Sequence, residues 1–271
     1  MSLKKKHPST IFSQNRSRDV FILGEFFPSP ERSDKEIYRK GDKVIIKFDS
    51  SFSKANILNE ALNQSRIEET GLNIPKLHEV RLLDDDQMIV MDYVPGNTLQ
   101  ELMDENPEKM DEYLELFVDL QIAIHQERAP LLNEMHSKMS RKIANSGLNA
   151  TIRYELDSRL AGMPVHNKVC HGDFNPTNII ITDDEEAYVL DWSHVTQGNG
   201  SHDAATTYLD FYLKGEKELA EKYIKLYAEK TNTALQYILK WCPIVAAEQL
   251  AKGIKENEEF LMRWVDVVEY E

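Results

Sequence analysis

Asp173, Asn178 and Asp191 are polar residues whose types and spacing could do chemistry together. Two short apolar runs, 179–182 and 187–190, flank a four-residue acidic segment, and this pattern predicts a β-hairpin. With the acidic residues unpaired in the turn, Asn178 falls opposite Asp191, and directly opposed side chains have Cβ atoms about 5 Å apart. An amide oxygen and a carboxylate therefore meet at the open end of the hairpin.

Two oxygen ligands at one point suit a hard cation such as Mg²⁺, which takes its other ligands from substrate phosphates and water. Asp173 lies five residues before Asn178, in a loop made tight by Gly172 and Pro176, so a third oxygen group faces the same point. A metal on one carboxylate, with a second carboxylate free beside it, is what phosphoryl transfer needs. Each residue alone would be read as a turn cap or a solvated strand end, but the combination favours catalysis.

The sequence HGDFNPTN at residues 171–178, with an Asp-Trp pair at 191–192, resembles the catalytic core of the aminoglycoside phosphotransferase and choline kinase family. Members of this family are small-molecule kinases with a protein-kinase-like fold. The resemblance implies that Asp173 orients and deprotonates the acceptor hydroxyl. It further implies that Asn178 and Asp191 hold Mg²⁺ against the nucleotide phosphates, while His171 braces the loop.

The first part of the chain reads as strands at 20–27, 36–39 and 43–48, a helix at 54–69 and a strand at 87–94. The resemblance implies that Lys47 neutralises the nucleotide phosphates and that Glu60 positions Lys47. It also implies a hinge whose backbone binds the purine, formed by Met91, Asp92, Tyr93 and Val94. The loop at 28–35 contains no glycine, which leaves the choice between ATP and GTP open.

After the hinge the sequence is mostly helical. Thr98 and Glu101 match a capping box, and apolar residues recur at helical spacing from 110 to 124. Asp203 is expected to brace the start of a helix by capping it, whereas His125 and His136 read as ordinary polar positions. In the family, acidic residues of the C-terminal helices receive cationic acceptors, and the candidates here are Glu248, Glu256, Glu258, Glu259 and Asp266.

Composition limits the class of protein. The 271 residues carry a formal net charge of −14 and show no basic cluster beyond residues 4–6, which argues against binding nucleic acid or an anionic membrane. Cys170 and Cys242 form no disulfide framework, and no apolar run approaches membrane-spanning length. We therefore expect a cytoplasmic protein, and these features do not fix its oligomeric state.

Together these features predict an α+β, two-lobed, protein-kinase-like fold, with a nucleotide-binding lobe at 1–94 and a catalytic and acceptor-binding lobe at 95–271. The predicted reaction moves the γ-phosphoryl group of ATP or GTP to a hydroxyl of a small molecule, such as an aminoglycoside or an amino alcohol. The glycine-free loop favours an alternative, a nucleotide-binding pseudokinase scaffold. A second alternative is a metal-dependent hydrolase, because histidines and aspartates cluster between 171 and 194.

Overall fold

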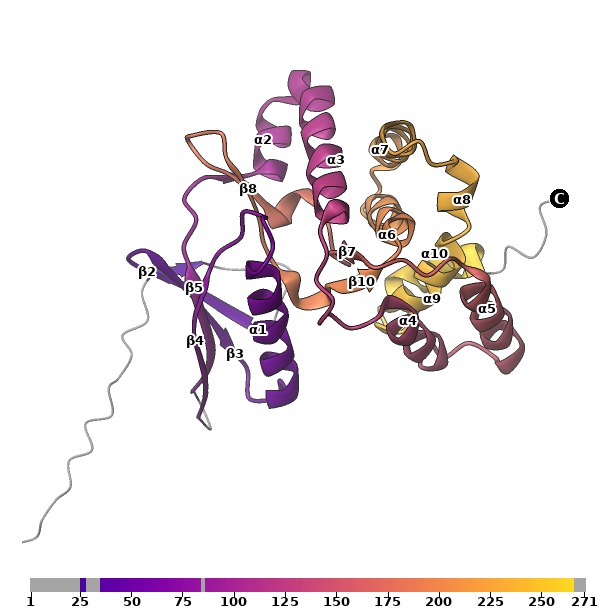
Figure 1. The fold of residues 1–271 in the computed structure, drawn as a ribbon, viewed down its shortest axis with the longest axis horizontal. Coiled ribbons are helices and arrows are strands. Elements are labelled where there is room, and N and C mark those ends of the chain that lie inside the picture. Colours follow the sequence, from indigo (N-terminus) through magenta and orange to yellow (C-terminus); the bar gives the residue numbers. More distant parts are fainter. Residues whose placement is uncertain (1–24, 28–34, 84–85, 266–271) are drawn as a thin grey trace, which may run out of the picture.

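The computed structural model describes residues 25–27, 35–83 and 86–265 of the chain. An antiparallel sheet with one helix forms the first part, and a mostly helical part follows it (Figure 1). Most of the predicted strand at 20–27, the glycine-free segment 28–34 and the acceptor candidate Asp266 lie outside the described residues.

Five strands form the first sheet, in the order β1-β2-β3-β5-β4 and antiparallel throughout. The strands are β1 (Glu25–Phe27), β2 (Lys35–Lys40), β3 (Lys43–Phe48), β4 (Leu77–Leu83) and β5 (Asp86–Asp92). One face carries helix α1 (Lys54–Glu68), which begins at the capping residue Ser53 and buries Ile57 and Ala61 against Phe48 and Ile89 of the sheet. The apolar alternation of β3 and β5 thus selects the face that α1 covers.

Two small sheets position the polar residues of the predicted hairpin. Strand β8 (Ile179–Ile181) pairs with β9 (Ala187–Val189) and with β6 (Asn97–Thr98). Strand β7 (Lys168–Cys170) pairs with β10 (Thr196–Gly198). The loop at 171–178 connects β7 to β8, so the two small sheets hold its two ends.

The hairpin exists, but its predicted register is wrong by one residue. Ile179 pairs with Val189 and Ile181 with Ala187, so Asn178 falls opposite Leu190 and not opposite Asp191. The turn is shorter than predicted because Thr182 already bonds to Glu186, and Glu185 adopts a left-handed backbone with a φ of 61°. A three-residue loop that ends in a left-handed residue is a common hairpin connection.

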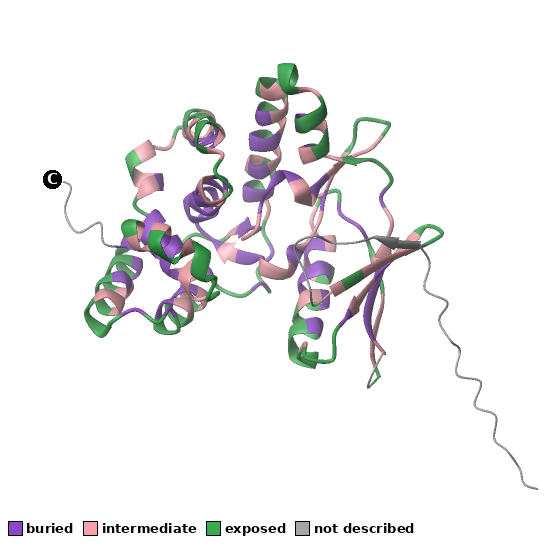
Figure 2. Cartoon of the chain, turned by 180° about the vertical axis from the view of Figure 1, so that it is seen from behind, coloured by how far each residue is buried: buried purple, intermediate pink, exposed green. Residues whose placement is uncertain are grey.

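The second part of the molecule is built from helices around one large apolar core. Buried residues lie on the inward faces of these helices, and exposed residues lie on the outside (Figure 2). The expected capping box forms at the start of α2, where Thr98 and Glu101 bond each other's backbone N–H groups. The helices are α2 (Leu99–Glu105), α3 (Met110–Gln126), α4 (Met135–Ala144), α5 (Ala150–Gly162), α6 (Gly200–Leu213), α7 (Lys217–Lys230), α8 (Leu235–Leu239), α9 (Cys242–Leu250) and α10 (Lys255–Val265).

The predicted fold class is confirmed: an antiparallel sheet lobe is followed by a mainly helical lobe. After β5 the chain passes directly into β6, which pairs with the hairpin of the second part. A boundary between residues 94 and 95 stays a prediction. In the described part of the chain, no helix is long and apolar enough to cross a membrane.

Candidate active site

His171 fixes the loop that carries Asp173. Its Nδ1 accepts a hydrogen bond from the backbone N–H of Asp173 at 3.3 Å, so the ring proton sits on Nε2 and is donated to the carbonyl of Leu190 at 2.9 Å. The ring is fully buried and lies against Trp192. Because both ring nitrogens are used within the protein, the expected bracing role of His171 is confirmed.

Asp203 holds the same loop from the other side. Its two carboxylate oxygens accept the backbone N–H groups of His171 at 3.1 Å and Gly172 at 2.7 Å. Glycine is required at 172 because φ is +81° and a Cβ there would lie 2.7 Å from the carbonyl oxygen of His194. The expected brace is therefore present, although Asn199, and not Asp203, caps α6.

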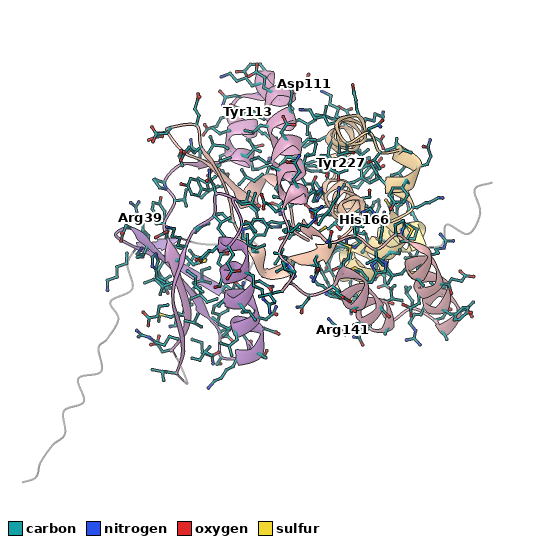
Figure 3. The ribbon with its side chains drawn as sticks, viewed as in Figure 1. Arg39, Asp111, Tyr113, Arg141, His166 and Tyr227 are labelled. Atoms are coloured by element: carbon teal, nitrogen blue, oxygen red, sulfur yellow. The ribbon has the colours of Figure 1, made fainter. Side chains whose placement is uncertain are left out.

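His125 is part of this brace, which corrects its reading as an ordinary polar position. It is buried, with Nε2 at 3.0 Å from the Asp203 carboxylate and Nδ1 at 3.0 Å from the hydroxyl of Tyr227, labelled in Figure 3. Burial alone would raise the pKa of Asp203. The hydrogen bond and charge of His125, the nearby His171 and the Gly172 N–H outweigh burial and hold this pKa at about 2. Asp203 is thus a buried, charged carboxylate that holds the backbone of the catalytic loop in place.

Asn178, an expected metal ligand, contacts the candidate base Asp173. Its amide nitrogen donates to the Asp173 carbonyl at 3.0 Å and to the Asp173 Oδ2 at 3.3 Å, so its amide oxygen is turned the other way. Asp191 has a left-handed backbone, with a φ of 57°, and accepts the N–H of Ser193 at 3.4 Å. Because of this turn, Asn178 and Asp191 line one cavity even though they are not opposed in the hairpin.

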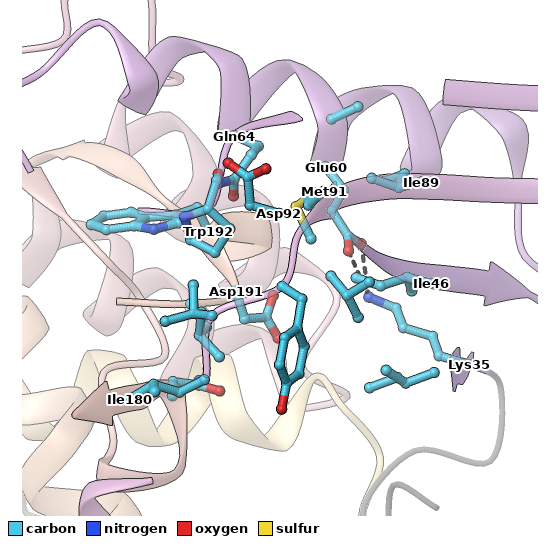
Figure 4. Close-up of a pocket in the computed structure, with 18 of the residues that line it drawn as sticks. Lys35, Ile46, Glu60, Gln64, Ile89, Met91, Asp92, Ile180, Asp191 and Trp192 are labelled. Carbon is cyan, nitrogen blue, oxygen red and sulfur yellow. Dashed lines mark hydrogen bonds and ion pairs between the residues drawn. The ribbon is translucent and has the colours of Figure 1, made fainter. Parts of the chain in front are cut away.

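A cavity of about 390 Å³, called here the first cavity, lies between the sheet and the hairpin (Figure 4). Its walls are largely apolar, and Ile46, Ile89, Met91, Ile180 and Trp192 are among the residues that line them. Such a slot, with a few polar groups at one end, suits a planar heterocycle that carries a charged tail.

All four predicted hinge residues, Met91, Asp92, Tyr93 and Val94, line the first cavity. The N–H groups of Asp92 and Tyr93 bond to the carbonyls of Lys76 and Asp42. The Asp92 carboxylate is also engaged, at 2.7 Å from Lys43 and 2.6 Å from His78. The guanidinium of Arg39, which is labelled in Figure 3, lies 3.9 Å from the Tyr93 ring centre.

Glu60 pairs with Lys35, and this corrects the expected pair with Lys47. The Lys35 ammonium lies 2.9 and 2.8 Å from the two carboxylate oxygens, and both side chains line the first cavity (Figure 4). Lys47 is opposite Glu36 in the β2–β3 ladder, one position after Ile46, which lines the cavity. Successive strand residues face opposite sides of a sheet, so Lys47 projects from the other face. The strand alternation of β3 was the signal that could have revealed this.

A second cavity, of about 600 Å³, adjoins the first, and the two share Lys35 and Glu60. Asp173 lines the second cavity, together with Lys138, Lys142 and Lys252. The two lobes meet here, because Asn63 of α1 donates to the carbonyl of Ser193 at 3.2 Å. The sequence reading missed the lysines, although the spacing of four between 138 and 142 places both on one helix face.

Of the acidic residues proposed as acceptor ligands, the four that the structure describes do not line either cavity. Glu248 is largely buried and lies 3.5 Å from the ring nitrogen of His202. Glu256, Glu258 and Glu259 are exposed on α10, where Glu259 pairs with Arg263. The expected acidic acceptor pocket is therefore not formed by these residues.

Both cysteines are buried, and burial raises the pKa of the Cys170 thiol well above its usual range and that of Cys242 to about 12. Cys170 therefore packs as a small apolar residue in the core. Within the described residues, no group of three or more His, Cys, Asp or Glu side chains is arranged to hold a metal ion. The expected metal ligands, Asn178 and Asp191, would share their ion with substrate oxygens.

Known proteins resemble the chain in sequence pattern and in fold. A sequence model of the phosphotransferase enzyme family matches residues 29–241. No curated protein sequence matches the chain significantly.

Among solved structures, the choline kinase LicA from Streptococcus pneumoniae is similar at 14% identity, over 88% of this chain and 91% of that one, with a TM-score of 0.60. A thermostable mutant of aminoglycoside phosphotransferase APH(4)-Ia in its apo form has 14% identity, coverage of 90% and 92%, and a TM-score of 0.64. A further variant of that protein, in a ternary complex with ADP and hygromycin B, has 13% identity, coverage of 90% and 91%, and a TM-score of 0.63. At such identities the likeness shows a shared fold.

Proposed function

Since the chain belongs to the phosphotransferase enzyme family, we propose that it transfers the γ-phosphoryl group of a nucleoside triphosphate, ATP or GTP, to a hydroxyl of a small molecule. ADP and an ATP analogue occupy complexes of similar proteins, which supports a nucleotide donor. In this proposal the first cavity takes the nucleotide and the second cavity takes the acceptor.

The purine would enter the apolar slot beside the hinge. The Asp92 and Tyr93 amides are already bonded, so the backbone N–H of Val94 is the hinge donor that a purine would use. Lys35, fixed by Glu60 at the junction of the two cavities, would contact the phosphates. This assignment replaces Lys47 with Lys35 and keeps Glu60 in its positioning role.

The donor set at the phosphate end fits Mg²⁺. The amide nitrogen of Asn178 is used by Asp173, which leaves its oxygen for a cation, and Asp191 adds a carboxylate in the same cavity. Mg²⁺ prefers such oxygen ligands and keeps water and phosphate oxygens as the others. When bound, it would neutralise charge on the transferred phosphoryl group.

The position of Asp173 carries the proposal. This carboxylate lines the second cavity, yet Asn178, which lines the first, donates to it at 3.3 Å. A hydroxyl in the second cavity can therefore meet a phosphoryl group at the end of the first. The hydroxyl oxygen forms a bond to the γ-phosphorus as the bond to the β,γ-bridging oxygen breaks, the nucleoside diphosphate leaves with that electron pair, and the proton passes to Asp173.

The test measures nucleoside diphosphate release with Mg-ATP and with Mg-GTP, for the wild type and for Asp173→Asn. A positioned general base contributes about 10²- to 10⁴-fold, so the variant should lose turnover by that factor. Nucleotide affinity, measured by titration calorimetry, should stay within about twofold because Asp173 does not line the first cavity. Turnover that survives in Asp173→Asn would refute the proposal. Nucleotide binding without any turnover in the wild type would support the pseudokinase alternative.

A further inference from the structure

The second cavity has the opposite charge to the one expected for a cationic acceptor. Four lysines and two carboxylates line it among the described residues. One carboxylate, Glu60, is bound to one lysine, Lys35, and the other is the candidate base Asp173. Lys138, Lys142 and Lys252, called here the lysine cluster, then outnumber the one remaining carboxylate, that of Asp173, around a polar space.

The members of the lysine cluster have no carboxylate partner in the described part of the chain. Lys138 is partly buried, and its ammonium donates to the carbonyl of His194 at 2.7 Å. Burial, together with the positive charges of Lys142 and Lys252, lowers the pKa of Lys138, whereas Glu248 and Asp203 oppose this. Neither Lys142 nor Lys252 forms an ion pair with a described residue.

Neighbouring groups reduce this charge only in part. Glu248 does not line the cavity but lies 3.5 Å from the ring of His202. Burial alone would raise the pKa of Glu248, but the nearby ring of His202 and the charges of Lys138 and Lys142 outweigh burial and hold that pKa at about 2. Burial and the charges of Lys138 and Lys252 lower the pKa of His194 to about 4, although Asp173 and Asp191 act in the other direction. His194 is therefore neutral at pH 7 and adds no charge to the cavity.

We propose that the acceptor is a hydroxylated small molecule that carries an anionic group, a carboxylate or a phosphate ester, bound by the lysine cluster. This inference rests on the proposed phosphotransferase function and names its substrate class. The exposed amides of Asn59 and Asn133, which also line the cavity, suit further hydroxyl groups. A choline or aminoglycoside cation in this cavity would be repelled by the lysine cluster, and only the carboxylate of Asp173 would offset that repulsion.

The geometry divides the acceptor between two contacts. Within the lysine cluster, Lys138 and Lys142 lie on α4, and Lys252 lies just after the end of α9. Asp173, in contrast, lies on the catalytic loop. An anion on the lysines thus leaves a hydroxyl at the other end of the same molecule free to meet Asp173. Binding energy from the remote anionic group then orients the reacting oxygen.

The experiment uses acceptors that differ in charge and share a polyol frame: glucose, gluconate, glucose 6-phosphate and glucosamine, with choline as a second cation. Nucleoside diphosphate release is measured for the wild type, Lys142→Glu, Lys252→Glu and the matched control Arg141→Glu. Arg141 precedes Lys142 on α4, is exposed and is labelled at the outer edge of that helix in Figure 3. Gluconate and glucose 6-phosphate separate the two sources of negative charge.

The anionic acceptors should exceed glucose in kcat/KM by about tenfold or more, and each cavity variant should remove that advantage while the KM for nucleotide stays constant. Arg141→Glu should behave as the wild type. Preference of the wild type for glucosamine or choline overturns the inference but leaves the phosphotransferase function intact, since release would still depend on Asp173. If no acceptor supports release, calorimetry on the ADP-loaded protein decides, and failure of both anions to bind more tightly than glucose overturns the inference.

Discussion

The first and second cavities share Lys35 and Glu60, yet they differ in wall chemistry and in the kind of sequence signal that reveals them. The first is an apolar slot whose polar groups pair with one another, as Lys35 does with Glu60. The second contains three lysines that have no carboxylate partner among the described residues and that come from distant parts of the chain. In the proposed function, the first cavity takes the nucleotide and the second takes the acceptor.

In the proposed function, the residues that catalyse phosphoryl transfer therefore differ from the residues that select the acceptor. Asp173 and Asn178 lie between the cavities, on a loop fixed from below by His171 and Asp203. Substitutions in the first cavity should affect every acceptor equally, whereas substitutions in the second should change the order of acceptors. Substitutions of residues in each cavity wall test this distinction.

Among substitutions in the first cavity, the largest loss is expected from Asp191→Asn. Removing one preorganised electrostatic contact costs about 10²- to 10³-fold, and here a metal ligand is removed as well, so kcat/KM should fall about 10³-fold for every acceptor. Calorimetry should show weaker binding of Mg-nucleotide, with nucleotide alone almost unaffected. A loss confined to one acceptor would contradict the division between the cavities.

Asp203→Asn should affect both cavities, because Asp203 holds the loop between them. Breaking a buried charge pair costs about 3 to 5 kcal/mol, so the free energy of unfolding should fall by about 3 kcal/mol in urea titrations. Asp111→Asn is the matched control, since Asp111 is exposed, pairs with Lys222 at the surface and is labelled in Figure 3. Its effect should stay within about 0.5 kcal/mol. Equal effects of the two changes would show that the brace carries no special stability.

Lys35→Met, compared with Lys47→Met, tests which lysine faces the phosphates. Lys35 lies 2.8 Å from Glu60 in the shared wall, so its loss should lower kcat/KM for the nucleotide by about 10²-fold. Lys47 lies on the opposite face of the sheet, and its loss should change kcat/KM by less than about threefold. A larger loss from Lys47→Met would restore the expectation drawn from the sequence.

The sequence predicted the fold and the catalytic loop well because local patterns encode both. Strand β3 has the predicted ends, and α1 begins at the predicted residue, because alternation and capping are local signals. The loop at 171–178 was found because its residue types and spacing occur together. His171 accordingly has the bracing contacts that the resemblance implied.

The wrong predictions concern features that depend on a one-residue shift in strand register or on contacts with residues far away in the sequence. Glu185 closes the hairpin one residue early, which a count of acidic residues could not show. Lys47 was chosen by residue type, although strand alternation places Lys35 on the cavity side. The approach of Lys252 to α4 depends on tertiary packing, so the local sequence could not reveal the lysine cluster.

The smallest expected effect is a pH-dependent loss of stability on substitution of Glu248, which lies close to the second cavity but does not line it. The folded-state pKa of Glu248 is about 2, below its usual 4.5, because the ring of His202, 3.5 Å away, and the charges of Lys138 and Lys142 outweigh burial. A depressed carboxylate pKa gives stability that is present above about pH 4.5 and is lost as the pH falls toward 2.

Glu248→Gln should therefore cost about 2 kcal/mol of unfolding free energy at pH 6, and the cost should shrink by pH 3. Urea titrations of both proteins at each pH measure this difference, and a cost that grows on acidification would contradict the assignment. Glu248 does not line the second cavity. The variant should therefore keep the order of acceptors while it loses stability, whereas Lys142→Glu should change that order, so the contrast between the two separates support of the cavity wall from recognition of the acceptor.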